Sequence, residues 1–166
     1  MSYHLTYFFM SFFTRRLAPH DAQLVIPLLR QSNRFFSDQE AAQAFLHELS
    51  KGREFRGVHD GTNMLGLIGW EDRGLPKHGV VEVIRFAIPE RKFVRSAAEL
   101  LFDTSLASID YYFRQQQQRL RKVFMVISNN RGHAKEFLED RGLIREAMLK
   151  NHYHDNRNES VYSLFC

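Results

Sequence analysis

The chain has little cysteine, and it has no long hydrophobic run. Its one cysteine, Cys166, is the last residue, so no internal disulfide framework can form; this is typical of proteins in a reducing cytoplasm, where we expect this one. Cys166 is also a poor candidate nucleophile, because chain ends are usually mobile and no base lies beside it in the sequence. No apolar segment reaches the ~20 residues that a membrane-spanning helix needs.

Charge of one sign is not in large excess either. The 23 Lys and Arg against 19 Asp and Glu give a formal net charge of +4, with a pI near 9.4. This charge permits attraction to anions but is too mild to predict a nucleic-acid partner. The densest polar run, RQQQQRLRK at 114–122, is interpreted most simply as the solvated end of a helix. Fractions of 44% hydrophobic and 25% charged residues are typical of a folded globular protein.

A chain of 166 residues without internal repeats or linkers predicts a single domain, residues 1–166. The first 13 residues, MSYHLTYFFMSFF, are rich in aromatics but lack the basic region and cleavage pattern of a signal peptide. For residues 1–10, three interpretations stay open: an extra edge strand, a contact in a homodimer, or an upstream extension in which Met10 is the true start.

The most informative stretch is VVEVIRFAIPERKFVRSAAELLF, residues 80–102. Its β-branched and aromatic residues run almost without interruption from Val80 to Ile88, which predicts a strand covered on both faces and ended by Pro89. Apolar residues then recur at helical spacing as far as Phe113, so we expect a long amphipathic helix that begins near Arg95.

The start of that helix is suited to bind phosphate. Free backbone N–H groups and the positive end of the helix dipole attract anions, and small side chains let a phosphate approach the backbone. The small side chains here are Ser96, Ala97 and Ala98, and the nearby cations are Arg91, Lys92 and Arg95. The alternative is an ordinary strand–loop–helix connection with a solvated basic loop, and these residues alone do not decide between the two.

The remaining elements follow from periodicity and from start and stop signals. Strands are predicted at 11–17, 54–59, 64–71, 80–88, 122–128, about 144–153 and 159–165, and further helices after 21, from 37 to 52 and around 134–138. Asp21 is a candidate cap of the first helix, which Pro27 should kink or shorten. Ser37 and Glu40 form a capping box, and Gly142 is suited to end the last helix.

The strand at 122–128 follows the strand at 80–88 through a long helix, so we expect these two strands to be parallel. The other strands follow one another closely enough to pair in antiparallel fashion. The predicted fold class is therefore α+β, a mixed α/β protein with a single mostly antiparallel sheet, one parallel crossover and about four flanking helices.

This order of elements resembles the GNAT superfamily of acyl-CoA-dependent N-acyltransferases, and it is most similar to the histone acetyltransferase branch. In that branch a buried strand with an acidic residue precedes a loop of pattern Gln/Arg-x-x-Gly-x-Gly/Ala, whose amides hold the pyrophosphate of CoA. The corresponding residues here are Glu82 in VVEVIRFAI and the segment 93–98, FVRSAA. HAKEFLEDRGLIREA looks like a later helix of the family, and the resemblance covers about residues 11–165.

The phosphate loop departs from the family pattern. Phe93 stands where the pattern has Gln or Arg, and Ser96 stands where it has Gly. A frame anchored on the preceding proline would instead place Lys92, Arg95 and Ala97 at the three positions. Because the bonds come from backbone amides, an altered loop can still bind phosphate, although a side chain can restrict close approach.

The resemblance implies few protein groups in the chemistry, since attack of an amine on a thioester needs a neutral amine and a place for its proton. It implies Glu82 as the general base, acting directly or through water. The alternatives are that Glu82 pairs with Arg85 or another basic residue, or that it faces outward. Leu138 matches the position of a Tyr that protonates the leaving thiolate in many family members, so another donor, such as Tyr153, would be needed.

The resemblance also implies acetyl-CoA as co-substrate, with the pantetheine arm paired to the strand at 86–88 almost as an added strand. The residues implied in cofactor binding are Phe86, Ala87, Ile88, Arg91, Lys92, Val94, Arg95, Ser96, Ala97, Ala98 and Asn130. Asn130 has an equally good interpretation as a helix cap. No metal is predicted, because His152, His154 and Asp155 lack a recognised ligand spacing.

Two functions follow from these observations. The first is an N-acetyltransferase that acts on a primary amine of a small molecule or a protein. The second is a catalytically degenerate CoA-binding or protein-interaction module on the same fold. The acceptor stays open in both, because fold analogy does not supply a substrate.

Overall fold

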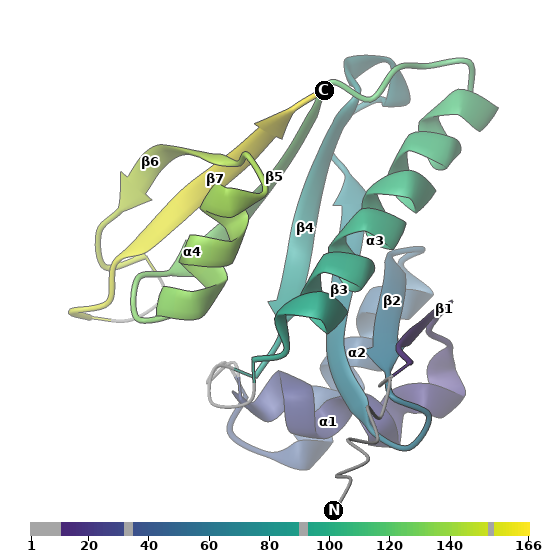
Figure 1. The fold of residues 1–166 in the computed structure, drawn as a ribbon, viewed down its shortest axis with the longest axis vertical. Coiled ribbons are helices and arrows are strands. Elements are labelled where there is room, and N and C mark those ends of the chain that lie inside the picture. Colours follow the sequence, from purple (N-terminus) through teal and green to yellow (C-terminus); the bar gives the residue numbers. More distant parts are fainter. Residues whose placement is uncertain (1–10, 32–34, 90–92, 153–154) are drawn as a thin grey trace, which may run out of the picture.

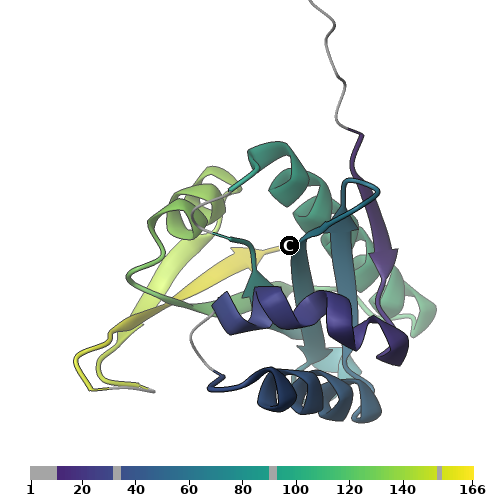
Figure 2. The ribbon, with the colours of Figure 1, turned by 90° about the horizontal axis from the view of Figure 1, so that it is seen from below.

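The computed structural model describes residues 11–31, 35–89, 93–152 and 155–166, which form one seven-stranded sheet with helices on both faces (Figures 1 and 2). The strands are β1 (Phe13–Arg16), β2 (Glu54–His59), β3 (Met64–Asp72), β4 (Val80–Ala87), β5 (Lys122–Ser128), β6 (Ile144–Leu149) and β7 (Glu159–Phe165). The helices are α1 (Ala22–Gln31), α2 (Asp38–Ser50), α3 (Arg95–Gln115) and α4 (Gly132–Asp140), with 3₁₀ turns at Pro19–Asp21 and Pro76–His78.

The sheet has the order β1-β2-β3-β4-β5-β7-β6. Neighbouring strands are antiparallel except β4 and β5, which are parallel and joined by α3. The predicted fold class is confirmed, and most predicted strand limits lie within two residues of those observed. The strand expected over about 144–153 is shorter than predicted, because β6 ends at Leu149 and the chain turns there.

Two apolar cores lie on opposite faces of the sheet (Figure 2). One is closed by α1 and α2, and the other by α3 and α4. β4 contributes to both cores, with Val83 and Phe86 on the α3 side and Ile84 and Ala87 on the α1 side. This double burial explains why β4 is apolar almost throughout. Within the described residues, no helix has the length and apolar character needed to cross a membrane.

The start of α2 has the Ser37 half of the predicted capping box, whereas the Glu40 side chain bonds the residue before the cap. Ser37 precedes the helix, and its Oγ accepts a hydrogen bond from the Glu40 backbone N–H at 3.0 Å. In return, Glu40 Oε2 accepts from the backbone N–H of Phe36 at 2.6 Å. Gly52 follows the helix with a φ of +79°, a left-handed conformation that favours glycine.

The start of α1 differs in detail from the prediction. Asp21 directly precedes the helix, but its carboxylate accepts from Ala18 N in the preceding turn and from the Arg15 guanidinium, at 2.6–2.8 Å. These bonds lower the pKa of Asp21, chiefly through Arg15. Pro27 lies inside α1, which continues to Gln31, so the proline does not end the helix.

Candidate functional site

The central feature of the molecule is a split between β4 and β5. The two strands pair only from Val80 opposite Lys122 to Val83 opposite Met125, although both strands continue beyond these pairs. Figure 1 shows them diverging below their paired ends, with α3 and α4 on either side of the opening. Beyond Val83, the edge of β4 that faces β5 makes no further backbone pairs with β5. An extended ligand can pair with such an edge.

An irregularity in β4 coincides with the end of this pairing. Arg85 lies opposite Gly69 on β3 and Val83 lies opposite Trp70, so Ile84 is an extra residue in β4. A bulge of this kind bends its strand and increases the local twist. We infer that the bulge directs β4 away from β5. Gly69 is required here, because a Cβ atom at this position would lie 2.3 Å from the Phe55 ring.

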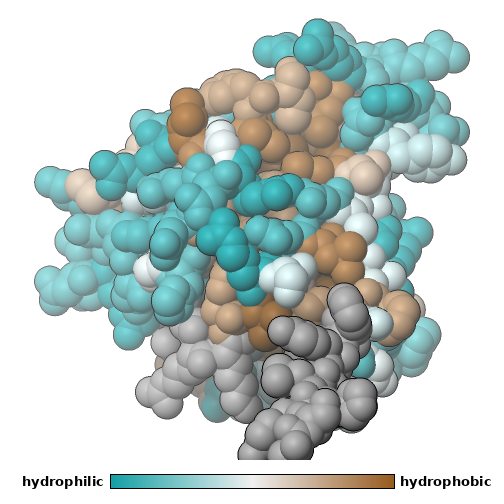
Figure 3. Space-filling view, viewed as in Figure 1, coloured by the Kyte–Doolittle hydropathy of each residue, from teal (hydrophilic) through white to brown (hydrophobic). Residues whose placement is uncertain are grey.

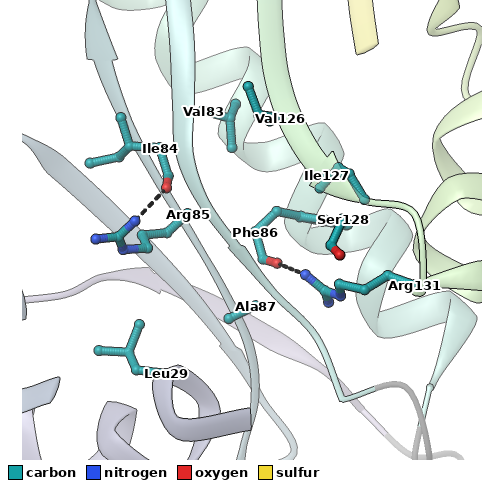
Figure 4. A pocket seen from close by; sticks show the side chains of 10 residues that line it. All are labelled: Leu29, Val83, Ile84, Arg85, Phe86, Ala87, Val126, Ile127, Ser128 and Arg131. Carbon is teal, nitrogen blue, oxygen red and sulfur yellow. Dashed lines mark hydrogen bonds between the residues drawn. The ribbon is translucent and has the colours of Figure 1, made fainter. Parts of the chain in front are cut away.

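A cavity of about 50 Å³ lies in the split (Figure 4). Its lining residues are Leu29, Val83, Ile84, Arg85, Phe86, Ala87, Val126, Ile127, Ser128 and Arg131. The walls combine apolar side chains with the polar groups of Arg85, Ser128 and Arg131, and β4 lies on one side and the end of β5 on the other. Of the residues implied in cofactor binding, Phe86 and Ala87 lie in this wall, and Ile88 follows directly.

Arg131 reaches across the split from the turn between β5 and α4 (Figure 4). Its Nη1 donates to the backbone carbonyl of Phe86 at 2.7 Å, and its Nη2 donates to that of Ile88 at 2.9 Å. The two carbonyls face the same edge because alternate residues of a strand point the same way. Arg131 was not predicted as a site residue, because nothing local to the segment NNRGH indicates a contact with residues 43 to 45 positions away.

Arg85 forms the charged part of the opposite wall. Its Nη2 donates to Glu48 Oε1 at 2.5 Å, and its guanidinium lies 5.5 Å from the centre of the Phe35 ring. The Glu48 side chain is only 8% exposed, and this burial raises the pKa of its carboxyl, while Arg85 and Arg53 oppose the rise. Glu48 was not predicted as a site residue, since it lies on the apolar side of α2 and its partner Arg85 is 37 positions away in the sequence.

Glu82 lies in the paired part of β4, opposite Glu71 on β3 and Phe124 on β5. Its Oε2 accepts a hydrogen bond from Arg73 Nε at 2.6 Å, and it does not line the cavity. The pairing of Glu82 with a basic residue, one of the alternatives considered above, is thus observed, and the basic residue is Arg73. Alternating charges connect the cavity wall to Glu82, in the order Arg85, Glu48, Arg53, Glu71, Arg73 and Glu82.

The first turn of α3 has one exposed small residue and two buried ones. Val94 is the N-cap and has no polar side chain to cap the helix. Ser96 is exposed, whereas Ala97 and Ala98 are 2% and 0% exposed and pack in the core. The small size of the alanines therefore serves packing, and of the three small residues only Ser96 is exposed.

The basic residues near this turn have different surroundings. Arg95 is exposed and pairs with Glu99 one turn later, at 3.1 Å, and with Asp140 at the end of α4, at 2.8 Å. These two carboxylates raise the pKa of Arg95, chiefly through Asp140. Arg91 and Lys92 lie outside the described residues. Phe93, at the altered loop position, stacks on His133 with ring centres 5.9 Å apart and so joins this loop to α4.

The residues that bear on the proton for the leaving thiolate differ in their surroundings. Leu138 is fully buried in α4, and Tyr153 lies outside the described residues. The buried Tyr162 hydroxyl donates to Glu139 at 2.8 Å, and burial raises its pKa to about 12, with Glu139 contributing. Asn130 is exposed in the turn before α4, and the N-cap of that helix is Arg131, so Asn130 is not the cap.

No cluster of His, Cys, Asp and Glu suited to a metal ion occurs within the described parts of the chain. Of the three residues weighed above, His152 lies 2.7 Å from Glu159 on β7, through its Nδ1, and His154 is outside the described residues.

A mostly antiparallel sheet split between two parallel central strands, with α1 and α2 on one face and α3 and α4 on the other, is the GNAT fold. Structures of this fold match the chain over most of its length. A GNAT-family protein from Desulfovibrio desulfuricans has 23% identity and a TM-score of 0.68, covering 93% of this chain and 99% of its own. Comparison with protein-family models and with curated protein sequences gave no match.

Two further structures carry more specific names. The ribosomal-protein-S18-alanine N-acetyltransferase of Escherichia coli has a TM-score of 0.72 at 9% identity and covers 93% of this chain and 94% of its own. The spermidine N-acetyltransferase of Vibrio cholerae, in complex with CoA and spermine, has a TM-score of 0.71 at 15% identity and covers 93% and 95%. Identities this low establish the shared fold and leave the acceptor open.

Proposed function

We propose that this chain is an N-acyltransferase that transfers the acetyl group of acetyl-CoA to a primary amine by direct attack in a ternary complex. The observation that carries the proposal is the edge of β4 beyond Val83, which β5 does not pair, in a GNAT fold. Acetyltransferases of a small amine and of a protein are among the structures that share this fold, and one of them contains CoA. One domain spanning residues 1–166 would carry the whole site.

The donor would lie along β4 and across the start of α3. The backbone of Phe86, Ala87 and Ile88 would pair with the amides of the pantetheine arm, as an added strand does. The N–H groups from Val94 to Ala97 would hold the pyrophosphate, whereas that of Ala98, also expected there, already donates to the Val94 carbonyl at 3.0 Å. Arg91, Lys92 and Arg95 would meet its charge, and Asn130 would lie at the opposite rim of the split.

The reaction needs a positioned carbonyl and a base. When bound, the thioester supplies an activated acyl group; the amine nitrogen attacks its carbonyl carbon, a C–N bond forms and the C–S bond breaks. Glu82 would take the proton that the amine loses, directly or through water. The thiolate leaves and takes a proton from solvent or from a donor such as Tyr153. The acceptor would be a small-molecule or protein amine, and the chemistry assigned to the chain uses no metal.

Two observations favour the second candidate, a CoA-binding or protein-interaction module without catalysis. Glu82 is bound to Arg73, and the position that holds a Tyr in many family members is the fully buried Leu138. Such a module would bind acetyl-CoA and turn over none of a broad panel of amines, which separates it from the enzyme.

The test is calorimetry with acetyl-CoA, CoA and a long-chain acyl-CoA, followed by turnover assays on small and peptide amines. We expect acetyl-CoA to bind with a Kd well below 1 mM, which corresponds to more than about 4 kcal/mol. If no thioester binds at or below that concentration, the proposal loses its basis. If the long-chain acyl-CoA binds more tightly than acetyl-CoA, the transferred group would be a long acyl chain, and the proposed reaction would still be N-acyl transfer.

A further inference from the structure

Arg131 occupies the edge of β4 that the proposed function needs. Its guanidinium donates to the carbonyls of Phe86 and Ile88, two residues apart on the side of β4 that faces the split. A guanidinium presents its N–H groups in a planar fork, so one side chain can bond two neighbouring carbonyls at once. Arg131 thus satisfies two backbone carbonyls that a paired strand would otherwise satisfy at this edge.

A ligand that pairs with β4 as an added strand would use the same edge. Its amide groups would have to approach Phe86 and Ile88 from the side of β5, where the Arg131 side chain lies (Figure 4). The Arg131 side chain and such a ligand would occupy the same space. The ligand-binding form therefore requires Arg131 to move.

The size of the cavity agrees with a closed split. Its volume of about 50 Å³ is far below the roughly 300–1,000 Å³ of typical small-molecule sites. Arg131 and Phe86 both line it, so the cavity is limited in part by the residues that make the contact. Movement of Arg131 would remove part of one wall and widen the opening of the cavity.

We propose that Arg131 is a latch, a side chain that holds the split between β4 and β5 closed and must release the carbonyls of Phe86 and Ile88 before an acyl-CoA can enter. The identity of the ligand rests on the proposed function, whereas the closure itself does not. The latch lowers the apparent affinity of the ligand, because only the open fraction of molecules can bind.

The first test is the affinity for acetyl-CoA, measured by calorimetry on wild type, Arg131→Ala and Arg131→Lys. Because the two hydrogen bonds involve a charged donor, their loss in Arg131→Ala should tighten binding by about 5- to 30-fold. Arg131→Lys, which keeps the charge but lacks the fork, should lie between the two. Arg145→Ala, which removes an equal charge from the exposed strand β6, should bind like wild type. Weaker or unchanged binding by Arg131→Ala with an unchanged melting temperature would overturn the latch.

The second test needs no cofactor. Ile127 lines the cavity and is only 3% exposed, and the native Cys166 is exposed, so the double variant Ile127→Cys, Cys166→Ser places a single buried thiol in the split. Its reaction rate with a small disulfide reagent reports on opening. Adding Arg131→Ala should raise that rate by about tenfold, and an equal rate would refute the latch. If no variant binds any acyl-CoA while the labelling rate rises, the proposed function fails and the latch stands.

Discussion

At the scale of single residues, the charged groups near the split bind one another. Arg73 joins Glu82 to Glu71, and Arg85 joins the cavity wall to the buried Glu48. Such pairing holds side chains in one geometry and keeps buried charge compensated. A base in this setting is oriented by its partner, so the role of Glu82 is best tested by a substitution that keeps its shape.

Glu82→Gln is that substitution. It removes the carboxylate that would accept the amine proton, so we expect kcat to fall roughly 100-fold. The affinity for acetyl-CoA should stay within about twofold, because Glu82 is not in the cavity wall. Steady-state kinetics and calorimetry measure the two effects. Glu146→Gln on β6 is the matched control, and an unchanged kcat in Glu82→Gln would remove Glu82 as the base.

Tyr162 gives a pH dependence. Its pKa is raised to about 12 by burial and by Glu139, against about 10 for an unfolded tyrosine. The folded state therefore favours the protonated phenol, and the resulting stability is complete below pH 10 and is lost as the pH rises through 12.

Wild type should consequently lose about 1–3 kcal/mol more of its free energy of unfolding than Tyr162→Phe between pH 9 and pH 12. Urea unfolding at intervals across this range measures the difference. Parallel pH profiles of the two proteins would contradict the prediction.

At the scale of elements, the bulge in β4 depends on its neighbour β3. The Phe55 ring of β2 lies against Gly69, is 1% exposed and is also held edge-to-face by Phe45 at 5.1 Å. An aromatic ring that covers a glycine on the neighbouring strand stabilises the pairing register. The bulge and the split are therefore supported from a part of the sheet that does not line the cavity.

Gly69→Ala should destabilise the protein by roughly 1–3 kcal/mol, because the ring cannot move without disturbing the core. Gly132→Ala is a suitable control, since an added Cβ there meets nothing within 4 Å. It should leave stability unchanged or raise it slightly. Denaturant unfolding of both variants is the measurement, and equal stabilities would show that Phe55 yields more easily than its packing indicates.

The start of α3 can be tested by charge. Ser96→Glu puts a carboxylate at the positive end of a 21-residue helix, which should leave stability unchanged or raise it by about 0.3–1 kcal/mol. The same carboxylate should repel the pyrophosphate and weaken acetyl-CoA binding at least about tenfold. Gln115→Glu makes the same change of charge at the other end of the helix and should leave affinity intact. Equal affinities of all three proteins would remove the phosphate site from α3.

At the scale of the whole molecule, the split divides the sheet into β1–β4 on one side and β5–β7 on the other. The two parts are connected by the paired ends of β4 and β5, the α3–α4 core, Arg131, the Arg95–Asp140 ion pair and the stacking of Phe93 on His133. Hydrophilic residues cover much of the outer surface near α4 and β6, and hydrophobic patches appear nearer the middle of the same face (Figure 3). A ligand in the split would contact both parts and stabilise the whole.

Acetyl-CoA should accordingly raise the melting temperature. At 100 times its Kd, a ligand that binds only the folded state adds about 2.7 kcal/mol to the free energy of unfolding. Thermal denaturation over a concentration series measures the effect. ATP, which has phosphates and adenosine but no pantetheine arm, should give a smaller shift, and equal shifts would mean that the split contributes nothing to binding.

Much of the fold could be predicted because its signals are local. The Ser37 cap of α2, the glycine after α4 and the apolar run of β4 each depend on residues within a few positions of one another. The proposed phosphate site was found for the same reason, since a strand and a helix start are adjacent in the chain. The ion pair between Arg15 and Asp21 was not predicted, because the local pattern also allows Asp21 to cap the helix that follows it.

The sequence by itself determined the class of fold and a strand–helix segment suited to phosphate, because periodicity and start signals act over short stretches of chain. Glu82 as the candidate base came from the resemblance to the GNAT superfamily. Only the tertiary structure decided which side chains meet at the split. Arg131 bonds Phe86 from 45 residues away, and Glu48 meets Arg85 from 37 residues away. Such contacts depend on how the helices pack and where β4 leaves β5, and no local pattern specifies either.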